Sequence, residues 1–282
     1  MRRSREVFFY LLIIVVVIIR YAAEGGDGPR RPAPGLPTEP DTPVLVPDDA
    51  PLPGNDRGAV TVELDAEVKN GVGTAFAVDG SGTFITARHV VDGCGRVFLV
   101  RGPRQLEPVV SATAQEDRDF AVLRASNLKP DYVSLSRRSP KRGEDGFMMG
   151  FPQGKAADVR ATVIGATEMR SVGRYRMREP VIAWVERERR PDFAGSLGGI
   201  SGGPVFDGEG YVVGTVVAGA PRRGRVYTTH PRVFADVGFL DGVERGDVQH
   251  ALSGGVSREN YDGKGKRLRA ERTIAQVYCK AD

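Results

Sequence analysis

The chain has 282 residues, of which 40% are hydrophobic and 27% charged, and its formal net charge is +4. This composition is typical of a globular protein with one large or two small hydrophobic cores. The basic excess is mild and scattered, whereas a nucleic-acid-binding surface concentrates basic residues in a stripe with aromatics, which argues against that class. Only two cysteines occur, and no cysteine–histidine cluster has metal-ligand spacing, so we expect no metal site and no cofactor.

Residues 1–24 carry a membrane signal, in which three arginines precede the apolar run 7–19. The run is short for a membrane span and suits the core of a signal peptide, but the bulky Tyr21 disfavours cleavage. We expect an uncleaved, single-pass signal anchor; a cleaved signal peptide and a buried core helix are the alternatives. The flanking arginines favour a cytoplasmic N-terminus, which would place the remainder of the chain on the extracytoplasmic side.

Residues 25–58 are predicted to form a linker, because they contain nine of the 19 prolines. Proline at this density removes amide donors and favours extended, semi-rigid polyproline II structure. Such a stretch cannot build a core, and we expect it to hold a folded unit away from a bilayer.

The folded unit, residues 59–240, consists of short β-branched runs separated by glycine-containing turns, which predicts an all-β antiparallel barrel or sandwich. Each half contains about six expected strands, which suggests two six-stranded β-barrels. The expected strands are 60–64, 72–78, 83–87, 97–101, 107–112 and 120–124, then 146–150, 159–166, 175–185, 203–206, 211–217 and 225–229. Residues 241–282 are expected to form a C-terminal extension whose stretch 273–278 packs as a helix or a strand.

Three polar residues stand in positions suited to nucleophilic catalysis. His89 directly follows a predicted strand, and Asp119 directly precedes another, where its carboxylate can fix an imidazole tautomer. Ser201 lies in Gly-Ile-Ser-Gly-Gly-Pro at 199–204, whose glycines suit a sharp turn with amide groups beside the hydroxyl. Taken singly, His89 reads as a solvent-facing residue and Asp119 as a turn aspartate; their order along the chain is that of a chymotrypsin-type triad.

With these residues the sequence resembles the trypsin-like serine proteases of chymotrypsin fold, in the bacterial HtrA (Deg) style. The matching pieces are Gly-Thr-Ala-Phe at 73–76, Thr-Ala-Arg-His-Val-Val at 86–91, Asp-Phe-Ala-Val-Leu at 119–123, the serine segment and Gly-Glu-Gly-Tyr-Val-Val-Gly at 208–214. The resemblance covers about residues 59–237. No PDZ-sized segment follows, and the family's common Asn or Asp before the serine is replaced by Ile200.

The resemblance implies a triad of His89, Asp119 and Ser201 in a cleft between two barrels, and an oxyanion hole formed by the amides of Gly199 and Ser201. It also implies a substrate-binding strand, with one pocket wall formed by Val216, Val217 and Ala218. Since Gly195, six residues before the serine, offers no acid, we expect an aliphatic P1 residue. The small residues of segment 193–199 suggest that the oxyanion hole forms only when substrate binds.

The two cysteines, Cys94 and Cys279, are candidates for a disulfide if the chain lies in an oxidising compartment. The alternative is two unrelated cysteines, one of them buried as a small hydrophobic residue.

We therefore expect a membrane-anchored, periplasmic serine endopeptidase of a bacterial-type cell, acting on protein or peptide substrates. The rival interpretation is a non-catalytic peptide-binding or chaperone-like module on the same fold. A binding module has no need to retain all three triad residues, which favours the enzyme.

Overall fold

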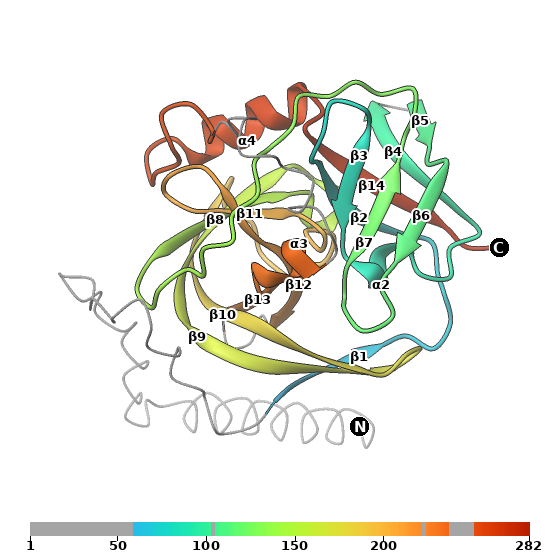
Figure 1. The fold of residues 1–282 in the computed structure, drawn as a ribbon, viewed down its shortest axis with the longest axis horizontal. Helices are drawn as coiled ribbons and strands as arrows, with labels where there is room; N and C mark the ends of the chain where they lie inside the picture. Colours follow the sequence, from blue (N-terminus) through green and yellow to red (C-terminus); the bar gives the residue numbers. More distant parts are fainter. Residues whose placement is uncertain (1–58, 103–104, 221–223, 237–250) are drawn as a thin grey trace, which may run out of the picture. The chain divides into compact units, whose positions relative to one another are not determined.

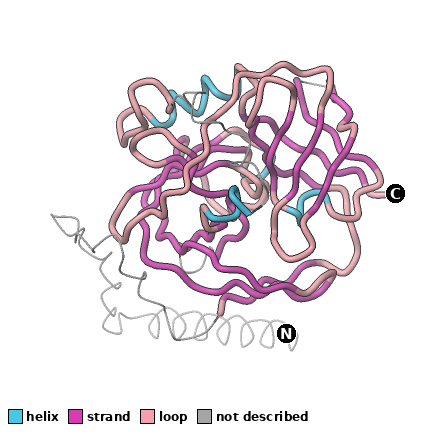
Figure 2. The backbone as a smooth tube through the Cα atoms, in the orientation of Figure 1, coloured by secondary structure: helices cyan, strands magenta, loops and turns pink. Residues whose placement is uncertain are grey.

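The structure is a computed structural model that describes residues 59–102, 105–220, 224–236 and 251–282. The expected membrane anchor and proline-rich linker lie outside these residues. Among the helices of the described ranges, none is both long enough and apolar enough to cross a membrane. Strands dominate the described chain, and helical segments are few and short (Figures 1 and 2), which confirms the mostly β prediction. The helical segments are α2 (Arg88–Val91), η1 (Pro152–Gly154), α3 (Arg232–Asp236) and α4 (Tyr261–Ala270).

The strands form two sheets. The first sheet has the order β5-β4-β14-β2-β3-β7-β6, and its pairings are antiparallel. Strand β3 (Thr-Phe-Ile-Thr) is buried along its whole length, as expected for β-branched and aromatic residues inside a sheet, and β7 buries Ala121 and Leu123. The strands are β2 (Gly71–Ala77), β3 (Thr83–Thr86), β4 (Arg96–Gly102), β5 (Gln105–Pro108), β6 (Ser111–Ala114), β7 (Ala121–Arg124) and β14 (Ile274–Lys280).

The second sheet has the order β1-β9-β10-β13-β12-β11-β8, and β8 also pairs with β9. Six of its strands are therefore linked in a continuous ring. Strand β1 lies outside this ring and pairs in parallel with the C-terminal end of β9, from Met169 to Gly173. The long pair β9 and β10 sweeps under the first sheet in Figure 1. The strands are β1 (Val60–Leu64), β8 (Asp145–Gly150), β9 (Ala157–Gly173), β10 (Met177–Arg190), β11 (Pro204–Phe206), β12 (Val212–Ala220) and β13 (Arg225–Thr229).

Each sheet has seven strands, not the six that the sequence suggested. In the first sheet, the expected strand 107–112 is split at Val109 and Val110 into the ends of β5 and β6. The Val109 amide donates to the Val97 carbonyl and the Val110 amide to the Arg124 carbonyl, so the chain crosses from one edge of the sheet to the other there. In the second sheet, β1 is the additional strand.

The segment expected as a C-terminal extension supplies a strand to the first sheet. Strand β14 pairs with β2 on one side and with β4 on the other, near the middle of the strand order. Cys279 in this strand forms a disulfide with Cys94, with the two Cα atoms 5.6 Å apart. The sequence could not decide between helix and strand here, because the alternation of buried and half-buried residues becomes visible only beside β2 and β4.

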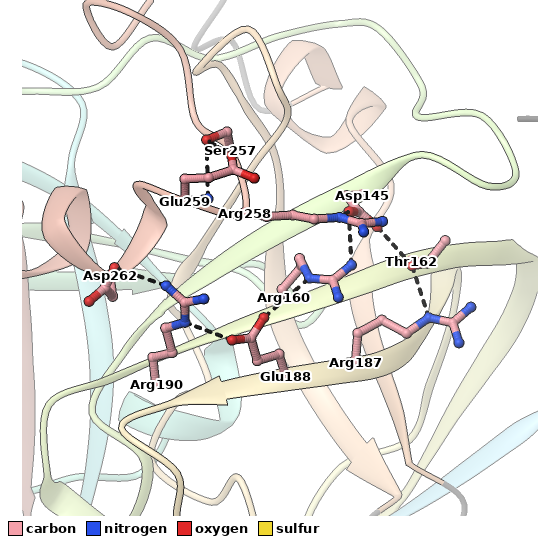
Figure 3. Close-up of polar contacts among 10 residues, drawn as sticks. All are labelled: Asp145, Arg160, Thr162, Arg187, Glu188, Arg190, Ser257, Arg258, Glu259 and Asp262. Atoms are coloured by element: carbon pink, nitrogen blue, oxygen red, sulfur yellow. Dashed lines mark hydrogen bonds and ion pairs between the residues drawn. The ribbon is translucent and has the colours of Figure 1, made fainter. Parts of the chain in front are cut away.

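Helix α4 connects this C-terminal segment to the second sheet. Figure 3 shows Arg190 of β10 between Glu188 (2.7 Å) and Asp262 of α4 (3.5 Å). The preceding turn adds Arg258, whose Nε lies 3.2 Å from Asp145 Oδ2 in β8. These partly exposed ion pairs orient the helix and contribute little stability individually.

A bidentate ion pair links α4 itself to the second sheet. Arg269 donates to both carboxylate oxygens of Asp158 in β9, at 2.6 and 2.8 Å, and the two side chains are 9% and 1% exposed. Bidentate pairing of this kind fixes orientation as well as distance. The C-terminal segment therefore joins the two sheets, with α4 on the second sheet and β14 in the first.

The two sheets also share a hydrophobic core. One cluster combines Phe76 of the first sheet and Phe120, which directly precedes β7, with Phe147 and Phe206 of the second sheet, and it includes Phe234 of α3. All five side chains are at most 3% exposed. Because residues of both sheets pack into one core, the strand ends of the first sheet are held at a fixed position beside the second.

Candidate active site

His89 and Asp119 lie side by side because of the strands that precede and follow them. Strands β3 and β7 pair antiparallel with Thr86 opposite Ala121. The end of β3 therefore lies beside the start of β7, where His89 follows in α2 and Asp119 precedes. His89 Nδ1 is 2.6 Å from Asp119 Oδ2, and the His89 amide donates to Asp119 Oδ1 at 2.9 Å. The carboxylate thus holds both the ring and the backbone of the histidine.

The imidazole retains limited solvent access, with 20% of the His89 side chain exposed against 3% for Asp119. Burial lowers the pKa of His89, but the charge of Asp119 and its hydrogen bond outweigh that effect, while Arg174 lowers the pKa slightly. The net pKa is raised above the ordinary value. A carboxylate that stabilises the imidazolium in this way suits a histidine that must accept a proton.

Ser201 lies in a turn that is fixed against β2. The Thr74 amide donates to the Ser201 carbonyl at 2.8 Å, and the Thr74 hydroxyl donates to the Gly199 carbonyl at 2.8 Å. Gly202 has φ +86°, and a Cβ there would lie 2.1 Å from the Thr74 carbonyl oxygen and 2.9 Å from the Ala87 nitrogen. The serine turn therefore passes directly beside the residues that lead into His89, and only glycine allows that approach.

Among the described residues, no hydrogen bond joins the Ser201 hydroxyl to the His89 imidazole. Catalytic hydrogen bonds are often long without substrate and shorten in the Michaelis complex. The structure thus brings His89 and Asp119 into direct contact and places Ser201 on the neighbouring turn.

The carbonyl groups that precede the two expected oxyanion donors are both occupied. The Gly198 carbonyl accepts the Gln153 amide, and the Ile200 carbonyl accepts the Gly203 amide at 2.8 Å. Both peptide groups are trans, so the Gly199 and Ser201 N–H groups point opposite to these carbonyls. In the described part of the chain neither N–H donates a hydrogen bond to another protein group.

The expected substrate strand lies in β12, where Val216 and Val217 are buried and Ala218 is half-buried. Val216 already uses both backbone groups, since its amide donates to Gly203 at 2.9 Å and its carbonyl accepts from Gly202 at 2.8 Å. The pairing with β13 shifts between Val216 and Ala218, which leaves Val217 at a bulge. Strand β11 pairs with β12 only as far as Thr215, so Val217 and Ala218 have a paired strand, β13, on one side only among the described residues.

Sequence reasoning missed the residues that β9 and β10 bring to the histidine. At the turn between these strands, Arg174 donates to the carbonyls of His89 (3.0 Å) and Asp92 (2.9 Å), and the Tyr175 hydroxyl lies 3.4 Å from Asp119 Oδ1. Glu179 in β10 is 4% exposed and accepts the Asp119 amide at 3.2 Å. A signal was present for Glu179, because it lies two residues from both Met177 and Val181 in β10 and so faces the same buried side as these apolar residues.

Groups suited to metal binding are a separate question. Across the ranges that the structure describes, no group of three or more His, Cys, Asp or Glu side chains is arranged to hold a metal ion.

Residues 73–214 match the family model described as "Trypsin-like peptidase domain". The chain is 29% identical over 147 residues to a "Probable periplasmic serine endoprotease DegP-like" of Chlamydia pneumoniae, which covers 52% of this chain and 28% of that protein. It is 28% identical over 149 residues to the protein y4bJ of Sinorhizobium fredii, covering 52% of this chain and 22% of that protein. The chain thus spans about a quarter of the length of these curated relatives.

Among solved structures, the chain is similar to the Rv3671c protease from M. tuberculosis, active form. The TM-score is 0.49 at 19% identity, covering 70% of this chain and 94% of that one. It is also similar to the HtrA-type protease AlgW with decapeptide, with a TM-score of 0.46 at 18% identity, covering 60% of this chain and 50% of the other.

Proposed function

Because this chain belongs to the trypsin-like peptidase family, we propose that it is a serine endopeptidase whose catalytic residues are His89, Asp119 and Ser201. The observation that carries the proposal is the contact of His89 with Asp119, at 2.6 Å, beside the glycine-framed turn of Ser201. A buried carboxylate bound to a partly exposed imidazole is the arrangement a general base needs. The two sheets correspond to the two barrels of a chymotrypsin-like fold, with the site between them.

In the proposed reaction, His89 Nε2 accepts the hydroxyl proton of Ser201 as Oγ attacks the carbonyl carbon of a peptide bond. The tetrahedral intermediate collapses as the imidazolium gives its proton to the leaving amine, which leaves an acyl-serine. Water, deprotonated by His89, then attacks the ester and releases the new carboxyl group together with Ser201. Asp119 keeps the tautomer and orientation of His89 and stabilises the imidazolium in both steps.

The amides of Gly199 and Ser201 are the proposed donors to the oxyanion. Support comes from their preceding carbonyls, which are bound on the opposite side by Gln153 and Gly203. Removal of one such donor typically costs about 10²–10³-fold in rate. The bound carbonyls favour donors that are oriented before substrate arrives over a hole that forms only on binding, which was the expectation from the sequence.

An extended peptide is the proposed substrate, bound by strand addition to Val217 and Ala218. A small or medium aliphatic P1 residue fits best, because Gly195 at the expected base of the pocket has no side chain to attract a cation. Nearby Leu197 and Val216 are buried apolar residues of the same core cluster. A peptide-library digest dominated by cleavage after arginine or lysine would exclude this preference.

For location, we propose that residues 7–19 anchor the chain in a membrane and that the protease unit lies outside the cytoplasm. The disulfide of Cys94 with Cys279 supports an oxidising compartment. The name of the Chlamydia pneumoniae relative, a periplasmic endoprotease, agrees with that location.

The proposal is tested by labelling with a fluorophosphonate probe, which reacts only with an activated serine. We expect the wild type to be labelled and Ser201→Ala to remain unlabelled. Ser111→Ala, at an exposed position of β6, is the matched control and should be labelled like the wild type. A folded wild type that binds extended peptides but is never labelled would instead establish the non-catalytic binding module.

A further inference from the structure

The segment 193–201, which contains the catalytic serine and the oxyanion donors, has all nine of its carbonyl groups engaged. Four are bound by the turn itself and by β2: the Leu197 carbonyl accepts Ile200 N–H, the Ile200 carbonyl accepts Gly203 N–H, and Thr74 binds the other two. The remaining five lie between Phe193 and Gly198. These five are bound by two residues that no motif of the sequence singled out.

Gln153 binds three of the five. Its side-chain amide donates to the carbonyls of Ala194 (2.9 Å) and Ser196 (3.0 Å), and its backbone amide donates to that of Gly198. Gln153 adopts φ 53° and ψ 27°, a left-handed conformation that is uncommon for glutamine. Backbone strain of this kind persists where the surroundings require it, often at functional sites. Here it presents the side-chain and backbone donors to one segment.

Arg189 binds the other two. Its Nη1 donates to the carbonyls of Phe193 (3.0 Å) and Gly195 (2.9 Å), and its guanidinium carbon lies 4.5 Å from the centre of the Phe193 ring. Glu186 holds the other side of the guanidinium through Nε and Nη2, so the arginine is itself fixed. The two side chains are about 15% exposed, which limits competition from water. The planar, five-donor fork of arginine allows this arrangement, and lysine could not reproduce it.

We propose that Gln153 and Arg189 are positioning residues that keep the oxyanion segment in its reactive orientation before substrate arrives. The reason is geometric: in a trans peptide N–H and C=O point in opposite directions, so a bound carbonyl fixes the direction of the following amide. Gln153 does this directly for Gly199, one of the two proposed oxyanion donors. Arg189 fixes the stretch that leads to it. This inference rests on the proposed function and extends it to two further residues.

The test uses Arg189→Gln, Gln153→Asn and the double variant. Asparagine tolerates the left-handed conformation and keeps the backbone donor, but its side chain is too short to reach both carbonyls. Arg190→Gln is the matched control, because Arg190 is the next residue and its ion pairs are with Glu188 and Asp262 (Figure 3). Thermal unfolding is measured for every protein to exclude global effects.

We expect each single variant to react about 10–100-fold more slowly with the fluorophosphonate probe. This loss does not exceed the cost of removing one oxyanion donor outright, because the donor is misaligned but still present. The melting temperature and the pH midpoint of labelling should stay near the wild-type values. The double variant should lose little more than the slower single variant, because both act on one orientation. Wild-type labelling rates in both single variants would overturn the proposal.

A second measurement does not depend on catalysis. In the Ser201→Ala background, digestion with chymotrypsin should cut after Phe193 or Leu197 much faster in the Arg189→Gln and Gln153→Asn proteins than in the Arg190→Gln control. Equal resistance in all of them would overturn the positioning role. The two measurements also separate the two proposals. If the wild type is never labelled but the substitutions still make segment 193–201 sensitive to chymotrypsin, the proposed protease activity is refuted and the positioning role is supported.

Discussion

Glu179 lies directly behind Asp119, and its Oε1 accepts the Asp119 backbone N–H at 3.2 Å. Two carboxyl groups thus occupy one nearly dry site next to His89. Burial raises the pKa of Glu179 to about 8, and the charge of Asp119 adds to the effect. At neutral pH the Glu179 carboxyl group is therefore mostly protonated. It then places no second negative charge beside Asp119.

Replacement of this acid should change how stability depends on pH. The protonated form of Glu179 is favoured in the folded protein, so its stabilising contribution is fully present below the unfolded pKa near 4.5 and is lost as pH rises through about 8. Between pH 5 and pH 9 the free energy of unfolding of Glu179→Gln should therefore rise by on the order of 3 kcal/mol relative to that of the wild type. Urea unfolding at several pH values measures this difference. Glu168→Gln, on the exposed part of β9, is the control, and parallel curves for Glu179→Gln and the wild type would contradict the prediction.

Asp119→Asn should abolish nearly all activity while the protein stays folded. An asparagine cannot hold the His89 tautomer with Nδ1–H, and in triads of this type the exchange lowers kcat by about 10⁴-fold. Activity requires a neutral His89 and falls as pH drops through its pKa. Because Asp119 raises that pKa, the residual activity of the variant should persist to lower pH.

Labelling rates measured from pH 5 to 9 check both effects. Asp117→Asn is the control, since Asp117 is an exposed neighbour whose ion pair is with Arg118. Activity of Asp119→Asn within tenfold of the wild type would remove Asp119 from the triad.

Loss of the disulfide should destabilise the fold without removing the site. The bond joins residues 185 positions apart, and the chain-entropy model assigns large effects to such long loops. We expect Cys94→Ser with Cys279→Ser to lose about 2–4 kcal/mol, seen as a lower melting temperature. A reducing agent should lower the melting temperature of the wild type to that of the double variant and leave the double variant unchanged. Equal melting temperatures for both proteins in all conditions would contradict the presence of the bond.

Gly202→Ala should damage both folding and labelling. The added methyl would lie 2.1 Å from the Thr74 carbonyl oxygen, at a φ of +86° that alanine rarely adopts. Strain of this kind costs about 1–3 kcal/mol before the clash is counted. Gly263→Ala is the control, and it should raise the stability slightly. A Cβ there meets nothing within 4 Å, and alanine favours the helix α4. Calorimetry and labelling of the two variants should therefore diverge; a Gly202→Ala protein as stable and reactive as the wild type would refute the close packing.

Sequence patterns anticipated the β-structure well where apolar residues are concentrated. The bounds of β1 and β13 match the expected runs, and β3, β7 and β8 differ from them by one residue. The long pair β9 and β10 was underestimated. Its outer parts carry charged residues that pair with one another, such as Glu168 with Arg170, and show no apolar alternation to predict a strand.

The limits at the site have a different origin. Motif order suffices to bring His89, Asp119 and Ser201 together as candidates, because each stands at a strand end or in a glycine turn. Gln153 and Arg189 act on backbone carbonyls, which are the same in every residue and leave no mark in the sequence. Such residues are identified only from the structure, where segments far apart in the sequence lie within hydrogen-bond distance of each other.

Strand β14 also constrains when the site can exist. It lies between β2 and β4, yet it is synthesised almost 200 residues after them, as the 185-residue separation of the disulfide shows. A chain emerging from the ribosome at about 5–20 residues per second holds His89 and Asp119 on a sheet that still lacks this strand. The sheet that positions His89 and Asp119 is therefore complete only after residue 280 has been synthesised.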